Sequence, residues 1–363
     1  MKIVVTGLRG FTNIQGGVET HCEELFPRLA ALGCDVTVVR RKGFVHENPV
    51  RTEYKGVKFK DLSAPATSGL EAAVHTVKAI LYARRVGADV VHIQAIGPSI
   101  AVPLAKLLGL KVVVTHHGPD YNREKWGKFA RAILRLGEFF AAKMADEIVV
   151  ISTVIDDILK TKYHRNDAHL IFNGVNKVTA PASTDYIDSL GLRKGNYILA
   201  VGRFVEEKGF DKLIEAFTQL PESDMRLVIA GDADRESPFS LRLKELARKN
   251  NVVLTGMIKG ERLAEIYANA ALYVLPSSHE GLPFTLLEAM SYGLKVLVSD
   301  IPANKAVHLP ESCYFHLDDP EDFVRCLRQR LADPQLPHYD LSPYDWDHIA
   351  RQFMDVYAHL LNH

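Results

Sequence analysis

The chain has 363 residues, of which 47% are hydrophobic and 24% are charged, a composition that excludes disordered and collagen-like proteins. Its 44 Lys and Arg residues balance its 44 Asp and Glu residues, so it is not a strongly basic protein and we expect no nucleic-acid partner. A chain of this length exceeds the size at which a single hydrophobic core stops growing, so we expect two domains.

The cysteines and the apolar runs indicate the cellular compartment. Cys22, Cys34, Cys313 and Cys326 form no Cys-x2-Cys pair and no zinc-ligand spacing. We therefore interpret them as buried thiols of a cytoplasmic protein. The apolar run at residues 3–5 is too short for a signal sequence, and the longest apolar stretch, residues 95–114, contains two prolines and two lysines. We expect neither a signal sequence nor a membrane-spanning helix.

Short β-branched runs alternate with helical patterns, which predicts parallel sheets covered on both faces. In the first half we predict strands at residues 2–6, 35–40, 57–61, 89–94, 111–115, 147–151 and 168–172, and helices at 17–32, 70–86, 98–108, 126–144 and 153–163. The second half has predicted strands at 196–202, 226–230, 251–255, 271–275 and 295–299, and a last helix at 345–360.

This order predicts an α/β protein with two doubly wound, Rossmann-like domains that face each other across a cleft. We place the first domain at residues 1–172, a polar linker at 173–190 and the second domain at 191–344. The helix within 345–363 has one apolar face, which suits packing back onto the first domain. Ligands of such sheets bind beyond the carboxyl ends of the strands.

Two carboxylates, Glu280 and Glu288, flank the Gly-Leu-Pro sequence that precedes a predicted helix. Glu280 is predicted on the loop and Glu288 on the second helical turn. Free N–H groups are expected at the start of this helix, at Gly281, Leu282, Phe284 and Thr285. Such donors favour a phosphate, and a nearby carboxylate can accept from ribose hydroxyls. The pattern favours a sugar-nucleotide site, whereas the alternative is a helix cap followed by a surface charge.

Glycines and cations follow the first strand of each half. Gly16 and Gly17 open a helix and would let the backbone approach a ligand closely, although they equally suit a simple turn. Arg203 and Lys208 stand five positions apart on a strand-to-helix loop. They could converge on one anion, or they could be ordinary surface charges.

Two further motifs lie at predicted strand ends. His116 and His117 follow the strand at 111–115, where an imidazole could bond a sugar hydroxyl or the reacting centre, or simply fill polar space. Asp232 and Asp234 form an Asp-x-Asp sequence without other ligands nearby. We interpret it as turn chemistry rather than as a metal site.

In order and spacing, these motifs resemble the retaining glycosyltransferases of family 4, which have the two-domain GT-B fold. The resemblance covers essentially the whole chain and rests on Gly-Gly-x-Glu at 16–19, His117-Gly118, Asn173-Gly174-Val175, Gly-Arg-x3-Glu-Lys-Gly at 202–209, Glu280-x7-Glu288 and Trp346 at the head of the last helix. There are two departures from the family pattern. Asn176 stands where an aspartate is frequent, and Gln94 stands where a histidine is frequent.

The resemblance implies a role for each motif. Gly16 and Gly17 would lie by the donor phosphates, Arg203 and Lys208 would hold the diphosphate, Glu288 would bind the ribose and Glu280 the donor sugar. The phosphate and sugar contacts would be completed by Gly281, Leu282, Pro283, Phe284 and Thr285. His117 would meet the transferred sugar.

The resemblance also implies the reaction. A hexose-type sugar would move from a nucleoside-diphosphate sugar, most commonly a UDP-sugar, to a glycan or lipid-linked acceptor of bacterial surface polysaccharide. Residues 1–172 would form the acceptor side and residues 191–344 the donor side. The cations would stabilise the leaving diphosphate, so we expect no metal and no cofactor. The resemblance implies a front-side reaction in which the leaving phosphate takes the acceptor proton, so we expect no carboxylate nucleophile. The alternatives are a sugar-nucleotide epimerase of the same fold and a non-catalytic nucleotide-sugar-binding protein. The region around Gly7 lacks the dinucleotide spacing of an oxidoreductase.

The first half carries an excess of positive charge, with 24 Lys and Arg against 17 Asp and Glu in residues 1–172. Basic residues gather on or beside the predicted helix at 126–144, namely Arg123, Lys125, Lys128, Arg131, Arg135 and Lys143. Apolar residues are interleaved with them, namely Trp126, Phe129, Ile133, Leu134, Phe139 and Phe140. This helix could rest peripherally on an anionic membrane at the inner face of the cell membrane. The alternative is a core-facing helix with a solvated basic face.

Overall fold

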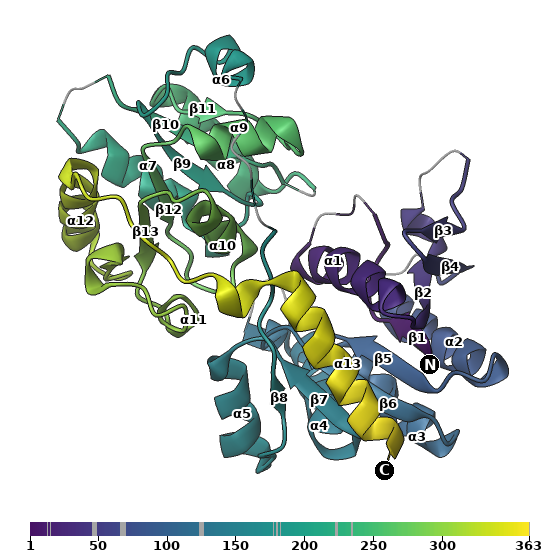
Figure 1. Cartoon of the computed structure of the whole chain (residues 1–363). Coiled ribbons are helices and arrows are strands. Elements are labelled where there is room, and N and C mark those ends of the chain that lie inside the picture. Colours follow the sequence, from purple (N-terminus) through teal and green to yellow (C-terminus); the bar gives the residue numbers. More distant parts are fainter. Residues whose placement is uncertain are drawn as a thin grey trace. The chain divides into compact units, whose positions relative to one another are not determined.

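The computed structural model describes residues 1–12, 14, 16–45, 49–65, 70–122, 127–176, 178, 181, 183–221, 224–233 and 235–362. The chain divides into two compact units. Unit 1 contains Met1–Gly174 and Pro343–His363, and unit 2 contains Val175–Ser342 (Figure 1). Each unit is a Rossmann-like α/β domain, so the predicted fold class is confirmed.

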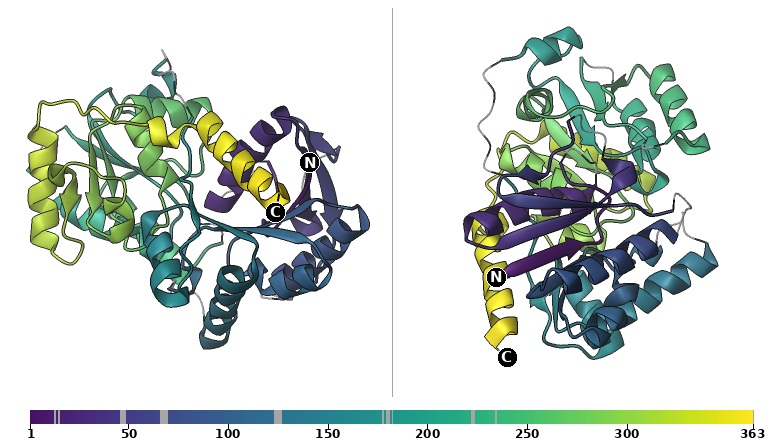
Figure 2. Two further views of the ribbon diagram at one scale, coloured as in Figure 1. Left: turned by 60° about the horizontal axis from the view of Figure 1, so that its bottom comes forward. Right: turned by 90° about the vertical axis from the view of Figure 1, so that its right-hand side faces the viewer.

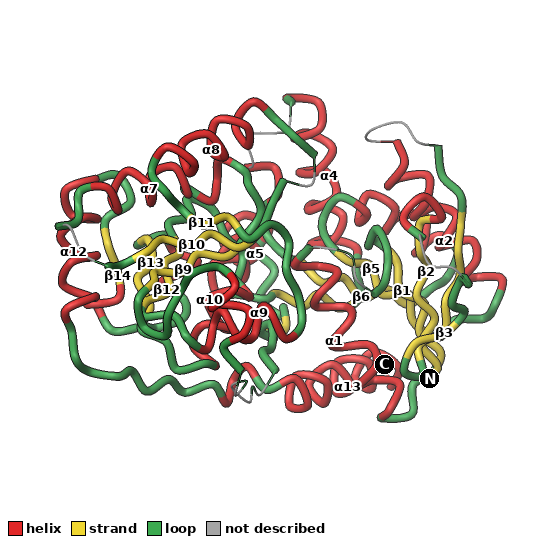
Figure 3. The backbone as a smooth tube through the Cα atoms, turned by 90° about the horizontal axis from the view of Figure 1, so that it is seen from above, coloured by secondary structure: helices red, strands yellow, loops and turns green. Residues whose placement is uncertain are grey.

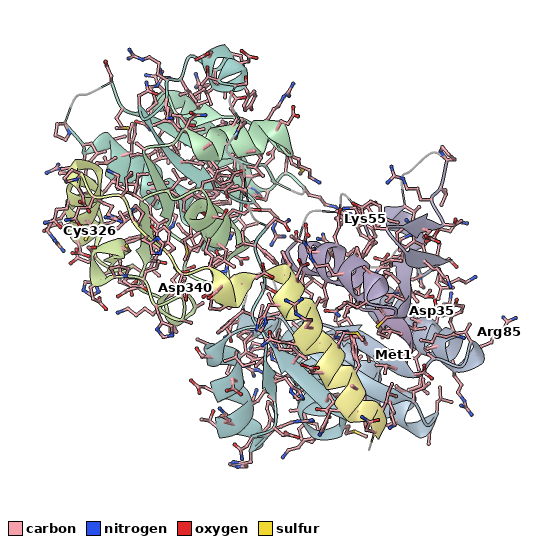
Figure 4. The ribbon with its side chains drawn as sticks, in the orientation of Figure 1. Met1, Asp35, Lys55, Arg85, Cys326 and Asp340 are labelled. Carbon is pink, nitrogen blue, oxygen red and sulfur yellow. The ribbon has the colours of Figure 1, made fainter. Side chains whose placement is uncertain are left out.

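Unit 1 is built on an eight-stranded sheet with the order β3-β4-β2-β1-β5-β6-β7-β8. Its strands are β1 (Lys2–Thr6), β2 (Asp35–Arg41), β3 (Glu53–Tyr54), β4 (Val57–Leu62), β5 (Val90–Gln94), β6 (Lys111–His116), β7 (Glu147–Val150) and β8 (His169–Leu170). Neighbouring strands are parallel except for the antiparallel pair β3–β4. Figure 4 labels Met1, which precedes β1, and Asp35, where β2 begins; the Asp35 N–H donates to the Met1 carbonyl at 2.9 Å.

Unit 2 is built on a six-stranded parallel sheet with the order β11-β10-β9-β12-β13-β14. Its strands are β9 (Tyr197–Val201), β10 (Arg226–Ala230), β11 (Val253–Leu254), β12 (Leu272–Leu275), β13 (Val296–Ser299) and β14 (Tyr314–Phe315). The central strands are buried on both faces because helices cover the sheet from both sides; Figure 3 shows these helices in red around the yellow strands.

The helices follow the predicted alternation. Unit 1 contains α1 (Gly17–Ala31), α2 (Leu70–Arg85), α3 (Val102–Leu107), α4 (Lys128–Met144), α5 (Thr153–Tyr163) and α13 (Trp346–Asn362). Unit 2 contains α6 (Asp185–Ser189), α7 (Phe210–Thr218), α8 (Pro238–Lys249), α9 (Glu261–Ala268), α10 (Phe284–Ser291), α11 (Pro302–Lys305) and α12 (Pro320–Ala332). In the described part of the chain, no helix is both long and apolar enough to cross a membrane.

The last helix, α13, packs against α1 within unit 1, as Figure 2 shows in yellow and purple. Its apolar face buries Trp346, Ile349, Phe353, Val356 and Leu360, among others. A Cβ added to Gly174 would lie 2.4 Å from the Trp346 ring, so a glycine is needed at that position. The hydrophobic effect therefore holds α13 on unit 1 although the whole of unit 2 separates it in sequence.

Each sheet has one point at which the strand order reverses. In unit 1 this switch point lies between β1 and β5, and in unit 2 it lies between β9 and β12. The loops that leave neighbouring strands there run to opposite sides of the sheet and leave room for a ligand at the carboxyl ends. We therefore look for the candidate residues at the carboxyl ends of the strands that flank these two switch points.

The structure corrects several predicted elements. The strands predicted at 168–172 and 251–255 shrink to the two-residue strands β8 and β11, while β3 and β14 were not predicted. Each of these is a short outer strand, where pairing depends on contacts distant in sequence rather than on a long apolar run. The predicted linker at 173–190 contains the short helix α6. The four cysteines are buried and unpaired.

Candidate functional site

Lys208 and Glu280 meet at the switch point of unit 2. Lys208 ends the short 3-10 helix Glu206–Lys208 after β9, and Glu280 lies on the loop after β12. The Lys208 Nζ is 2.5 Å from the Glu280 Oε1, and the two side chains are only 14% and 11% exposed. The structure therefore brings together the two residues that were predicted for the diphosphate and the donor sugar.

Glycines allow the two loops that carry this pair to approach each other. Gly209 has φ +62°, and a Cβ there would lie 2.4 Å from the Pro276 carbonyl oxygen. The Ser278 N–H donates to the Glu207 carbonyl at 2.9 Å, which ties the loops together. A Cβ on Gly202 would lie 3.2 Å from the Phe210 Cζ and 3.4 Å from the Lys208 Cε. Gly202 and Gly209 thus have a steric reason that the spacing of the motif alone did not reveal.

Glu288 lies on the second turn of α10, as predicted, but its surroundings differ from those of Glu280. The Tyr267 hydroxyl donates to the Glu288 Oε2 at 2.9 Å, and the Tyr267 ring stacks on Tyr292 with centroids 5.4 Å apart. Burial raises the pKa of Glu288 to about 7, against the opposing effect of the Tyr267 hydrogen bond. Sequence analysis missed Tyr267, because this contact joins α9 to α10 across 21 positions.

The helix α10 begins at Phe284, and Pro283 occupies the N-cap position without a side-chain cap. Leu282 and Pro283 are buried, whereas Gly281 and Thr285 are partly exposed. No described residue accepts a hydrogen bond from the N–H of Gly281, Leu282 or Thr285. Those donors can receive an anion, with the helix dipole adding to the attraction.

Arg203 lies two residues beyond β9 and is partly exposed, at the same edge of the sheet as Lys208. The following residue, Phe204, is buried and its N–H donates to the Asp232 carbonyl at 3.1 Å, which fixes the backbone beside Arg203.

The Asp232 carboxylate accepts from the Ala233 N–H and from Lys244, both within 2.9 Å, as expected for turn chemistry. Asp234 lies outside the described residues. Within the described ranges, no group of three or more His, Cys, Asp or Glu residues could hold a metal ion.

In unit 1, Gly16 precedes α1 and Gly17 is its first residue. The Arg9 backbone N–H and guanidinium donate to the Glu19 carboxylate at 3.0–3.3 Å, and Glu19 is buried. A Cβ on Gly16 would lie 2.1 Å from the Glu19 Oε2. The glycine therefore makes room for an Arg9–Glu19 ion pair at the start of α1, a contact that sequence analysis did not predict.

The adjacent histidines at the end of β6 have different partners. His116 donates from Nε2 to the Glu138 Oε1 at 3.1 Å and accepts the Gly118 N–H at Nδ1, also at 3.1 Å. Glu138 is fully buried and also accepts from Lys162 and Tyr163. Burial raises the pKa of Glu138, but these hydrogen bonds outweigh it and lower the pKa to about 2. Both ring nitrogens of His116 are therefore occupied by hydrogen bonds that hold the loop after β6 in place.

His117 is the less constrained of the two. Its Nε2 is 2.8 Å from the Gln94 Oε1, and its ring centroid is 4.9 Å from that of His21. His21 is itself bonded through Nδ1 to the Asn173 Oδ1 at 2.9 Å. Burial lowers the pKa of His21 to about 4, and burial together with the neighbouring imidazoles lowers the pKa of His117 well below 6.5. These rings are therefore neutral near pH 7. Neither Gln94 nor Asn173 was predicted as part of the site.

Two family models match the chain, and together they span nearly all of it. "Glycosyltransferase Family 4" matches residues 15–178 and "Glycosyl transferases group 1" matches residues 183–340. The two matched ranges correspond closely to the contiguous parts of the two units.

Individual relatives agree with these models. An uncharacterized glycosyltransferase of Methanocaldococcus jannaschii, MJ1607, is 22% identical over 98% of this chain and 98% of its own length. The amylovoran biosynthesis glycosyltransferase AmsD of Erwinia amylovora is 24% identical over 57% of this chain and 58% of its own length, so the match spans little more than half of that relative. The fold matches that of HepE from Anabaena in complex with UDP-glucose, with a TM-score of 0.81, 16% identity and coverage of 99% of this chain and 100% of that one. The chain belongs to the family 4 glycosyltransferases, which have the GT-B fold.

Proposed function

We propose that this glycosyltransferase moves a hexose-type sugar from a nucleoside-diphosphate sugar to a glycan or lipid-linked acceptor in bacterial surface polysaccharide synthesis. The proposal rests chiefly on one arrangement: the Lys208–Glu280 pair lies at the switch point of unit 2, on loops that also lead to the open N–H groups of α10. A lysine and backbone N–H groups suit a diphosphate, and carboxylates suit sugar and ribose hydroxyls. The UDP-glucose held by HepE and the amylovoran pathway named for AmsD support a UDP-sugar donor and a polysaccharide acceptor.

We propose a reaction that retains the anomeric configuration and needs no metal. The bond between the anomeric carbon and the diphosphate oxygen breaks, and Arg203, Lys208 and the N-terminus of α10 stabilise the negative charge that develops on the diphosphate. The acceptor hydroxyl attacks the same face of the sugar, and its proton passes to the leaving diphosphate oxygen. Glu280 binds the donor sugar, Glu288 the ribose, and His117 a hydroxyl of the transferred sugar.

The donor site is tested first by binding. Thermal shifts are measured with UDP-, GDP- and dTDP-sugars, with and without EDTA, because a ligand of the native state raises the melting midpoint. We expect one nucleotide to stabilise the protein equally in both conditions. Lys208→Ala should reduce this shift, whereas Lys212→Ala, which removes an exposed lysine from the neighbouring helix α7, should leave it unchanged. If Lys208→Ala fails to fold, the Lys208→Ala/Glu280→Gln variant removes both members of the buried pair.

The reaction is tested by its products. With acceptor present, NMR should show a glycosidic linkage of the same anomeric configuration as the donor, together with released nucleoside diphosphate. Conversion of the donor sugar into its epimer without any acceptor would instead identify an epimerase. Binding without any turnover, across a panel of lipid-linked and oligosaccharide acceptors, would point to the non-catalytic alternative. Wild-type binding by Lys208→Ala would refute the assigned site.

We further propose that α4 attaches the enzyme peripherally to an anionic membrane. Leu134, Glu138 and Ala141 are among the residues that it buries in unit 1. Its opposite side exposes Phe129 by 81%, Leu136 by 44% and Phe139 by 43%, and also exposes Lys128, Arg135 and Lys143. The spacing of three to four residues places these side chains on one helical face. The helix thus buries one face and presents exposed aromatic and basic residues on the other, a pattern suited to an anionic lipid surface. Arg123, Lys125 and Trp126 lie outside the described residues.

Sedimentation with lipid vesicles tests this attachment. The wild-type protein should bind vesicles containing phosphatidylglycerol and should bind neutral phosphatidylcholine vesicles much less. Phe129→Ser/Phe139→Ser should lose most of this binding. Leu336→Ser is the matched control, because Leu336 is 83% exposed but belongs to unit 2. Equal sedimentation of all three proteins would refute the proposed surface.

A further inference from the structure

Gln94 is the last residue of β5, at the switch point of unit 1. Its side chain is fully buried, and its Oε1 lies 2.8 Å from the His117 Nε2. A carboxamide oxygen has no proton and can only accept a hydrogen bond. The proton of the neutral His117 ring is therefore on Nε2, and Nδ1 carries a lone pair.

The surroundings of His117 keep Nδ1 available as an acceptor. Burial and the nearby rings of His21, His116 and His92 hold the pKa of His117 well below 6.5, so Nδ1 is unprotonated near pH 7. No described residue is hydrogen-bonded to this nitrogen, and the residue remains partly exposed. A group that approaches Nδ1 has to bring its own proton, as a sugar hydroxyl does.

The backbone holds Gln94 in a fixed place. Gln94 pairs with Thr115 in the ladder between β5 and β6, and the next residue, Ala95, donates to the Thr115 carbonyl at 2.9 Å. Gly7 passes so close that a Cβ there would lie 2.3 Å from the Gln94 carbonyl oxygen. The Gln94 Nε2 is buried without a hydrogen-bond partner among the described residues. A buried amide group without a hydrogen-bond partner lowers the stability of the fold, so the presence of glutamine at this position calls for an explanation.

We propose that Gln94 is a positioning residue that fixes His117 as the Nε2–H tautomer, so that Nδ1 accepts a hydroxyl of the transferred sugar. This inference rests on the proposed function for the identity of the ligand. The tautomer itself does not depend on that function. Because lowered pKa values keep the rings of His21, His92 and His117 neutral near pH 7, the contact recognises an uncharged hydroxyl rather than a carboxylate or phosphate.

Nitrogen NMR tests the tautomer directly in the full-length protein without substrate. Long-range proton–nitrogen spectra distinguish a protonated ring nitrogen from an unprotonated one, and the His117→Ala variant assigns the signals. We expect His117 to show a protonated Nε2 and an unprotonated Nδ1. Gln94→Glu should keep the Nε2 proton, because a carboxylate also only accepts, while Gln94→Leu should give a mixture of tautomers. A protonated Nδ1 in the wild-type protein would overturn the inference, whether or not the protein proves to be a transferase.

Turnover separates positioning from a general structural role. With a panel of monodeoxy donor sugars, the wild-type enzyme should discriminate against the loss of one particular hydroxyl. His117→Ala and Gln94→Leu should each reduce that discrimination about tenfold, and the double variant should behave as His117→Ala alone. Gln352→Leu, the same substitution at a partly exposed position of α13, is the control. Equal losses on every donor, or additive losses in the double variant, would overturn the inference.

If Gln94→Leu fails to fold, Gln94→Glu still gives an answer. Its carboxylate should raise the pKa of His117 and protonate Nδ1, so turnover should be low near pH 6 and should recover as the pH rises. Turnover is measured with saturating donor, which removes the pH dependence that Glu288 imposes on donor binding, and under that condition the wild-type enzyme should lack this ionisation. A pH profile for Gln94→Glu that matches the wild-type profile would also contradict the proposal.

Discussion

The pKa of Glu288 predicts that donor binding depends on pH. Ribose hydroxyls donate hydrogen bonds, so they bind the ionised carboxylate better than the protonated form. In the free protein, burial raises the pKa of this carboxyl from 4.5 to about 7. At pH 8 most molecules are ionised, and at pH 6 only about one in ten is. The donor therefore has to displace a proton at pH 6, and its affinity should be about tenfold lower there than at pH 8.

Isothermal titration with a nucleoside-diphosphate sugar measures this effect. A nucleotide sugar is preferable to a free nucleoside diphosphate, because the esterified diphosphate has no ionisation near pH 7. Glu288→Gln keeps an oxygen that accepts the Tyr267 hydroxyl but cannot titrate. Its binding should be weaker and independent of pH from 6 to 8. An equal pH slope in both proteins, or no slope in the wild type, would refute the assignment of Glu288 to the donor.

The same carboxyl also makes the stability of the fold depend on pH, but here the protonated form is the favourable one. Because the folded protein binds the proton more tightly than the unfolded chain, the stability contributed by Glu288 is complete below pH 4.5 and is lost as the pH rises to about 7. At about 1.4 kcal/mol per pKa unit, ionised Glu288 costs up to about 3 kcal/mol of the free energy of unfolding at pH 8. Denaturation by urea should show Glu288→Gln to be more stable than the wild type at pH 8, and the difference should disappear near pH 4.5.

Two further substitutions test the parts that hold the site. Gly209→Ala should destabilise unit 2 by about 1–3 kcal/mol and weaken donor binding, because its Cβ would clash with the Pro276 carbonyl oxygen. Gly195→Ala has a similarly positive φ but no atom within 4 Å, so urea denaturation of the pair isolates the clash. Glu138→Gln should cost about 3 kcal/mol, because it removes the fully buried charge that accepts hydrogen bonds from buried His116 and Tyr163 and from the more exposed Lys162. Glu245→Gln, at an exposed pair, should change the melting temperature little.

The sequence was sufficient to predict the elements whose signal is local. The long central strands could be predicted because they are buried on both faces of the sheet and so form continuous apolar runs, which include Val4, Val91 and Val113. Glu288 could be placed on a helical turn because periodicity begins at Phe284. The two-residue strands β3 and β14 could not be predicted, because their pairing depends on partners in the folded sheet.

The site contacts were harder to predict for the same reason. Tyr267 reaches Glu288 from a different helix, and Gln94 reaches His117 from the neighbouring strand. Nothing in the sequence around either residue marks that contact. In the sequence, Gln94 stands out only as a departure from the family pattern. Burial sets the direction of the pKa shifts here, and hydrogen bonds between distant segments set the tautomers, so the chemical state of these residues follows only from the three-dimensional arrangement.

The two glutamates of the motif illustrate this difference most clearly. Glu280 is compensated by Lys208 at 2.5 Å, whereas no described lysine, arginine or histidine forms an ion pair with Glu288. Glu280 therefore keeps a charge partner in the free protein, while the burial of Glu288 is offset only in part, by the Tyr267 hydrogen bond. A diphosphate that takes Lys208 releases Glu280 to accept sugar hydroxyls, and a ribose that donates to Glu288 relieves its desolvation. In our proposal, donor binding replaces Lys208 by sugar hydroxyls as the partner of Glu280, and it adds ribose hydroxyls to the single Tyr267 hydrogen bond of Glu288. Two identical side chains eight positions apart therefore favour the same ligand for different physical reasons.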